Sequence, residues 1–128
     1  MNIFINKKIL IYGLGKSGLS AFKFLKNKSD IFLYDDYQLK YKYFKVKKNL
    51  ISYKKILKKK FDIIILSPGI DINKCKLSKF LKKNNHKIYS DLDIFYAFYK
   101  NDCITITGTN GKSTTCQLMY KVLLDQKF

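Results

Sequence analysis

The chain has 128 residues, of which 47% are apolar, so it is long enough to bury the core of one domain. Its formal net charge is +17, but all 26 basic residues are lysines, and arginine, which favours bidentate readout of bases and phosphates, is absent. We therefore expect no nucleic-acid partner. No apolar run approaches the length of a membrane span, and the first residues lack the pattern of a secretory signal, which predicts a cytoplasmic protein with no membrane partner.

Short apolar runs between turn residues predict buried strands, and apolar residues three or four positions apart predict helices. In chain order the expected elements are strand 8–12, helix 17–25, strand 31–34, a short strand near 44–51, helix 53–59, strand 61–67, helix 77–83, strand 87–90, helix 92–99 capped by Asp91, strand 103–107 and helix 112–124. This alternation predicts an α/β fold with a Rossmann-like, doubly wound parallel sheet. We expect one domain over 1–92 and the first strand, P-loop and helix of a second, incomplete ATP-binding domain over 93–128.

The stretch YGLGKSG places Gly13, Gly15 and Gly18 in the spacing G-x-G-x-x-G, between a predicted strand and a predicted helix. In turns that hold a diphosphate, the first glycine permits the tight turn and the second lets a phosphate approach the backbone. The third lets the helix pack close to the strand. The start of the helix offers unpaired N–H groups, and the Ser17 hydroxyl is a further donor.

Two later strand ends carry further candidates. Asp35 ends the second strand, where a carboxylate accepts from ribose hydroxyls, whereas for Asp36 a solvated turn and a ligand contact are equally open. After the predicted strand 61–67, the backbone of Ser67 and Gly69 borders the same edge, unless Pro68 and Gly69 form only an ordinary turn. Because NAD, FAD and a UDP-sugar all present a diphosphate and a ribose, an NAD(P)-binding oxidoreductase or regulatory domain remains an alternative.

The stretch GTNGKST at 108–114 is similar to a P-loop, although Ile106 stands where the early glycine usually lies. Backbone N–H groups from Thr109 to Lys112 can surround a phosphate. Lys112 supplies positive charge to the outer phosphates of a nucleotide, and Ser113 offers a hydroxyl to Mg²⁺. Two such turns in one chain predict two phosphate-bearing ligands that meet at a domain boundary.

The stretch TGTNGKST at 107–114 resembles the ATP loop of the Mur ligases, which build the peptide of peptidoglycan. The stretches GLGKSGLS, LYDD, LSPGI and SDLDIF occur in the order and spacing of the branch that adds D-glutamate; a sibling Mur ligase is the alternative. The resemblance implies an ATP- and Mg²⁺-dependent ligase for peptidoglycan precursor synthesis. Its substrates would be UDP-N-acetylmuramoyl-L-alanine and D-glutamate, joined through an acyl phosphate with release of ADP.

Carried over onto this sequence, the resemblance implies two groups of site residues. The UDP group would be held by Gly13, Gly15, Lys16, Ser17, Gly18, Asp35, Asp36, Ser67, Pro68 and Gly69. ATP would be held by Gly108, Thr109, Asn110, Gly111, Lys112, Ser113 and Thr114. Lys112 would be the catalytic residue, and Ser113 would bind the metal. Because the family has three domains, we expect the N-terminal portion of a longer, monomeric ligase, inactive by itself.

Overall fold

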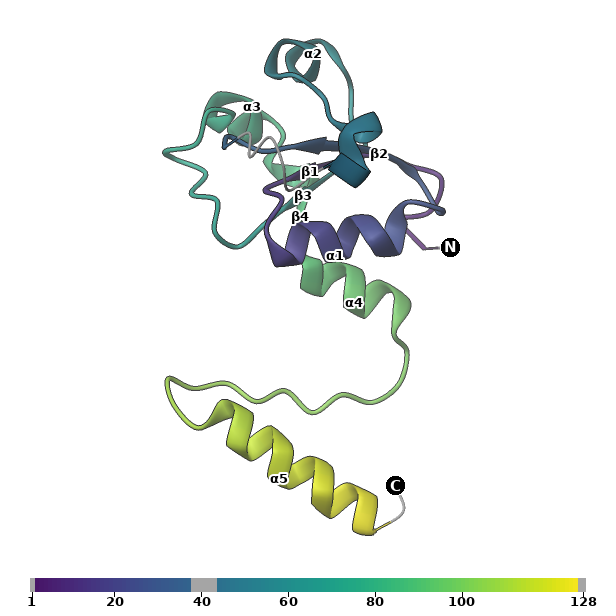
Figure 1. Ribbon diagram of the computed structural model, residues 1–128, viewed down its shortest axis with the longest axis vertical. Coiled ribbons are helices and arrows are strands. Elements are labelled where there is room, and N and C mark those ends of the chain that lie inside the picture. Colours follow the sequence, from purple (N-terminus) through teal and green to yellow (C-terminus); the bar gives the residue numbers. More distant parts are fainter. Residues whose placement is uncertain (1, 38–43, 127–128) are drawn as a thin grey trace.

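The computed structural model describes residues 2–37 and 44–126. At its centre lies a parallel sheet of four strands in the order β2-β1-β3-β4 (Figure 1). The strands are β1 (Lys8–Tyr12), β2 (Asp30–Tyr34), β3 (Ile63–Leu66) and β4 (Ile88–Tyr89). The α/β class and the parallel sheet predicted from the sequence are confirmed.

Helices cover both faces of this sheet (Figure 1). One face packs against α1 (Lys16–Leu25) and α4 (Asp91–Phe98), and the other against α2 (Tyr53–Lys58) and α3 (Ser78–Lys83). Successive side chains of β1 point to opposite faces, so Ile9 and Ile11 join the first core cluster and Leu10 and Tyr12 join the second. A strand buried on both faces explains why the predicted run is continuously apolar.

The outer edge of β2 is covered by the segment that follows it. The Asn49 side-chain amide donates to the Ile31 carbonyl at 2.9 Å, and the Ile51 N–H donates to the Leu33 carbonyl at 3.0 Å. Two backbone acceptors of an edge strand are thereby paired within the chain.

This arrangement corrects the short strand predicted near 44–51. A 3₁₀ helix, η1 (Phe44–Asn49), stands there instead, and only Leu50 forms a bridge, with Leu33. A side-chain amide and a single bridge pair the strand edge, so no further ladder forms. The helices predicted at 53–59 and 77–83 are confirmed by α2 and α3. Residues 38–43, which belong to a stretch without a clear sequence pattern, lie outside the described residues.

Helix α4 begins one residue earlier than predicted. Ser90, and not Asp91, is its N-cap: the Ser90 hydroxyl accepts from the Asp93 N–H at 3.3 Å, and the Asp93 carboxylate accepts from the Ser90 N–H at 2.6 Å. This reciprocal pair is a capping box, which needs a hydroxyl at the cap and an acceptor three residues later. The buried Ile94 joins α4 to the core beside α1.

The strand predicted over 103–107 is wrong. This segment has no strand partner among the described residues, and a strand forms only where a neighbour completes its hydrogen-bond ladder. The helix predicted after it is confirmed as α5 (Lys112–Asp125). Apart from half-buried Met119, the residues of α5 are exposed, and the helix lies apart from the sheet (Figure 1).

A short 3₁₀ helix, η2 (Asn85–Lys87), leads into β4. Within residues 2–37 and 44–126, none of the helices combines the length and the apolar character required to cross a membrane.

Candidate functional site

The candidate site lies at the carboxyl ends of β1 and β3. From β1 the chain crosses to β2 on one side, and it then returns to form β3 on the other side of β1. In doubly wound sheets, the loops diverge at such a switch point and leave a crevice in which ligands bind. The turn at 13–18 follows β1 and the stretch 67–69 follows β3, so the fold brings these predicted residues to one edge.

Two of the three turn glycines are required by packing. Gly13 has a φ of +93°, in the left-handed region, and a Cβ built on it would lie 2.7 Å from the Cβ of Ser67. A Cβ built on Gly18 would lie 1.9 Å from the carbonyl oxygen of Gly13. Because neither glycine has a side chain, α1 can start directly against the end of β1.

Gly15 differs from its neighbours because packing does not require it. A Cβ built there would meet no atom within 4 Å, and its φ of −70° is open to any residue. Gly15 is the N-cap of α1 and is exposed, and no side chain caps the helix. The N–H groups of the first turn of a helix have no acceptor within that helix. The bare backbone therefore leaves the positive end of α1 open to an anion.

Asp35 binds the turn itself. One carboxylate oxygen accepts from the Leu14 N–H at 2.7 Å, and the other accepts from the Tyr37 N–H at 2.8 Å. Because a carboxylate offers about four lone-pair positions, Asp35 can hold the turn and still accept from a ribose hydroxyl.

Asp36 lies in a small polar network behind the turn. Its Oδ2 accepts from the Tyr12 hydroxyl at 2.7 Å and from the Lys76 N–H at 3.2 Å. Its Oδ1 is buried and has no hydrogen-bond partner in the described part of the chain. Burial and then the hydrogen bond to Asp36 raise the pKa of Tyr12 far above its ordinary value. Burial and the Asp36 charge raise the pKa of Tyr34 to about 12. Both phenols therefore stay protonated at neutral pH.

Ser67 joins the ends of β1 and β3. Its hydroxyl donates to the Gly13 carbonyl at 2.7 Å, and its N–H donates to the Tyr12 carbonyl at 3.0 Å. The following residues, Pro68 and Gly69, are exposed and form a turn closed by the Ile70 N–H on the Ser67 carbonyl at 3.0 Å. This turn is a rim beside the glycine turn.

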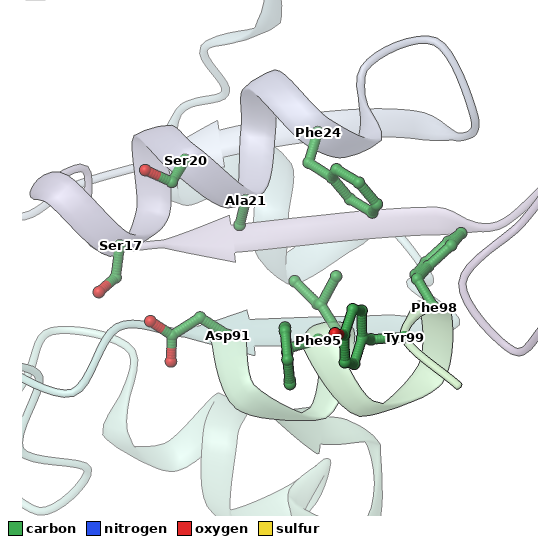
Figure 2. Close-up of a pocket in the computed structure, with 9 residues that line it drawn as sticks. Ser17, Ser20, Ala21, Phe24, Asp91, Phe95, Phe98 and Tyr99 are labelled. Atoms are coloured by element: carbon green, nitrogen blue, oxygen red, sulfur yellow. The ribbon is translucent and has the colours of Figure 1, made fainter. Parts of the chain in front are cut away.

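A groove of about 380 Å³ runs between α1 and α4 from the Ser17 end of the site. Figure 2 shows the Ser17 hydroxyl and the Asp91 carboxylate at one end, and the rings of Phe24, Phe98 and Tyr99 toward the other. The exposed side chain of Lys16 precedes Ser17 at the start of α1.

The second predicted loop lies apart from this edge (Figure 1). Gly108 and Gly111 have φ values of +147° and +76°, and Gly111 is the N-cap of α5. The Lys112 ammonium donates to the carbonyls of Gly108 and Thr109, so it lies within the curve of the loop. Asn110, Ser113 and Thr114 are exposed in the same segment. The structure thus does not bring the glycine turn at 13–18 and the loop at 108–114 together.

Sequence reasoning missed three participants: Tyr12, Leu14 and Lys76. A tyrosine at the end of a buried strand is a usable signal, because a buried phenol needs a hydrogen-bond partner. The backbone donors of Leu14 and Lys76 carry no such signal, since any residue supplies an N–H.

The family model of the Mur ligase MurD-like N-terminal domain matches residues 7–89, more than half of the chain. Relatives called UDP-N-acetylmuramoylalanine--D-glutamate ligase are similar over most of it. That of Rickettsia prowazekii is 40% identical over 96% of this chain, that of Aquifex aeolicus 36% over 91%, and that of Wolbachia pipientis wMel 33% over 96%. The chain spans 28%, 25% and 25% of these relatives. The chain therefore belongs to the Mur ligase MurD-like family, whose N-terminal domain it contains.

Proposed function

We propose that this chain is the N-terminal portion of a ligase that uses ATP to add D-glutamate to UDP-N-acetylmuramoyl-L-alanine, and that the sheet edge binds the UDP group. The observation that carries the proposal is Gly15. Its missing side chain serves no packing purpose, yet it leaves the N-terminus of a ten-residue helix open at the switch point. Family membership and the names of the relatives support the choice of ligand.

Each group at the edge has a part in this proposal. The N–H groups at the start of α1 bind the diphosphate, assisted by the Ser17 hydroxyl and the Lys16 ammonium. Asp35 accepts from the ribose hydroxyls while it holds the turn through Leu14. Asp36 and the rim at 67–69 border the uridine.

We propose that the second loop binds a nucleoside triphosphate, and its geometry supports this. Its two glycines adopt left-handed conformations, and the loop leads into the N-terminus of a 14-residue helix. The Lys112 ammonium already lies against loop carbonyls, where it can neutralise phosphate charge, and the exposed Ser113 hydroxyl can bind Mg²⁺. ATP would supply the phosphoryl group that activates the substrate carboxylate. In this proposal residues 1–92 bind UDP and residues 93–128 begin the ATP-binding domain.

The 128-residue chain should not catalyse amide formation alone. The two glycine loops bind phosphates, but the chain spans about a quarter of its relatives, and most barrier lowering comes from positioned groups around both substrates. Release of ADP that depends on D-glutamate, measured on the purified chain, would contradict this. In the longer protein we propose a monomer.

The first test is a calorimetric titration of the chain with UDP-N-acetylmuramoyl-L-alanine, and separately with NAD, at moderate salt. Pyrophosphate at the same salt measures how much binding the net charge of +17 produces without a nucleoside. We expect the UDP-sugar to bind more tightly than either reference. NAD binding in its place would support the oxidoreductase alternative.

Two variants locate the binding. Asp35→Asn keeps one acceptor for the Leu14 N–H and removes the negative charge. We expect it to lower the affinity for the UDP-sugar. Lys23→Ala, an exposed change on α1 away from the turn, removes one unit of charge and is the control. If net charge alone caused the binding, Asp35→Asn, which makes the chain more positive, would strengthen binding of the UDP-sugar, and Lys23→Ala would weaken it.

A further inference from the structure

Tyr12 has a role that the proposed binding groups do not include. It is the last residue of β1, and its side chain is fully buried on the face covered by α2 and α3. From there the hydroxyl donates to Asp36 at 2.7 Å, at the carboxyl edge of the sheet. Strand β1 thus fixes one carboxylate oxygen of Asp36, which lies beside the candidate site.

Asp36 in turn holds the end of the loop that follows β3. Its Oδ2 accepts from the Lys76 N–H at 3.2 Å, and its carbonyl accepts from the Lys76 ammonium at 3.1 Å. Lys76 ends the connection at 67–76 between β3 and α3, and the other end, Ser67, is bound to Gly13. This connection includes the rim, and both of its ends are tied to strands or turns of the site.

We propose that Tyr12 is a positioning residue, which acts through Asp36 to hold the 67–76 connection against the nucleotide site. The identity of the nucleotide rests on the proposed function; the tie between Tyr12 and Lys76 does not. Asp36 Oδ1 has no hydrogen-bond partner among the described residues, so the bonds that Tyr12 and Lys76 donate to Oδ2 help to orient this carboxylate. Removing the hydroxyl takes away the shorter of the two hydrogen bonds to Oδ2 and leaves the Lys76 N–H on that oxygen.

The hydroxyl is a lasting donor. Burial, followed by the bond to Asp36, raises the pKa of Tyr12 above its ordinary value, so the phenol keeps its proton at neutral pH. Figure 1 shows β1 in the middle of the sheet, with the connection to α3 along one side. A fixed donor on the central strand therefore reaches a loop that is far from it in sequence.

The experiment uses Tyr12→Phe, which removes one oxygen and keeps the ring. Two quantities are measured on the full chain: hydrogen exchange of the Lys76 amide without ligand, and the affinity for UDP. We expect exchange at Lys76 to speed up and UDP affinity to fall, each by about tenfold, the scale of one hydrogen bond to a charged group. Exchange in β3 should change less, which separates a local effect from general loss of stability.

Tyr89→Phe is the matched control, because it makes the same change on β4, against Phe4 and away from Asp36. A second variant, Asp36→Ala, should lower the affinity for UDP by a similar factor. If Tyr12 acts through Asp36, adding Tyr12→Phe to this variant should lower the affinity little further.

Unchanged Lys76 exchange in Tyr12→Phe overturns the proposal, and so does faster exchange with unchanged UDP affinity. Additive losses in the double variant also overturn it. A wild-type chain that does not bind UDP contradicts the proposed function and the positioning of a nucleotide with it. That result is distinguishable, because the exchange measurement needs no ligand.

Discussion

Ser67 donates its hydroxyl to the carbonyl oxygen of Gly13 at 2.7 Å, across the point where the sheet changes winding direction. The same serine fills the space that a Gly13 side chain would need. One residue after β3 therefore explains both the shape of the glycine turn and the proximity of the two loops.

Replacing Ser67 tests this link. Ser67→Ala should lower the free energy of unfolding by about 1 kcal/mol, because the carbonyl of the buried Gly13 loses its side-chain partner. Chemical denaturation followed by circular dichroism measures the change. Ser20→Ala, on the exposed surface of α1, is the reference, and an equal effect in both would contradict the link.

The two glycines at the start of α1 should separate folding from binding. Gly18→Ala should cost about 3 kcal/mol or more, since its Cβ would overlap the Gly13 carbonyl. Gly15→Ala should lower the free energy of unfolding by no more than about 1 kcal/mol, the scale of a changed N-cap, and should still lower the affinity for UDP. Thermal unfolding and UDP titration measure the two effects. A Gly15→Ala chain that binds UDP normally would remove the main support for the proposed function.

The capping box of α4 should give an acid-dependent contribution to stability. The backbone and hydroxyl bonds from Ser90 lower the pKa of Asp93 below its ordinary value. Because the Asp93 carboxyl has a lower pKa in the folded state, its ionised form stabilises the fold at pH values above its unfolded pKa of about 4. This contribution to stability is lost as the pH falls through the folded pKa. Ser90→Ala should cost about 1 kcal/mol at pH 7 and less in acid. A cost that does not vary with pH would contradict the coupling.

The buried tyrosines should make the fold sensitive to alkali. Burial raises the pKa of Tyr34 to about 12, so its contribution is complete below the unfolded value of about 10 and is lost as the pH rises from there. The free energy of unfolding of Tyr34→Phe should fall less steeply than that of wild type as the pH rises from about 10 to 12. The comparison with wild type cancels the titration of the lysines. Identical pH curves would show that Tyr34 titrates alike in both states.

Helix α5 should exchange its amide hydrogens much faster than β1 and β3. Its residues are exposed apart from half-buried Met119, and isolated helices of this length are marginal in water. Exchange measured by NMR or mass spectrometry checks this. Protection of α5 equal to that of β1 would show that the helix packs against another surface in solution.

Much of the fold was predictable because the signals are local. The apolar runs at β1 and β3 and the glycine spacing after β1 each specify a strand or a turn within a few residues. The strand at 103–107 failed because a strand also needs a partner, which a local pattern does not supply. The tie from Tyr12 through Asp36 to Lys76 joins residues 24 and 40 positions apart, so only the packed sheet reveals it.

The exposed position of α5 has a consequence for handling the protein. Leu118, Tyr120 and Val122 are each at least 60% exposed, in a helix reached through a segment without secondary structure. Proteases cut such segments readily, whereas the paired strands resist them. Limited digestion should therefore trim the chain between α4 and α5 and leave a smaller, more crystallisable core that keeps the whole carboxyl edge of the sheet.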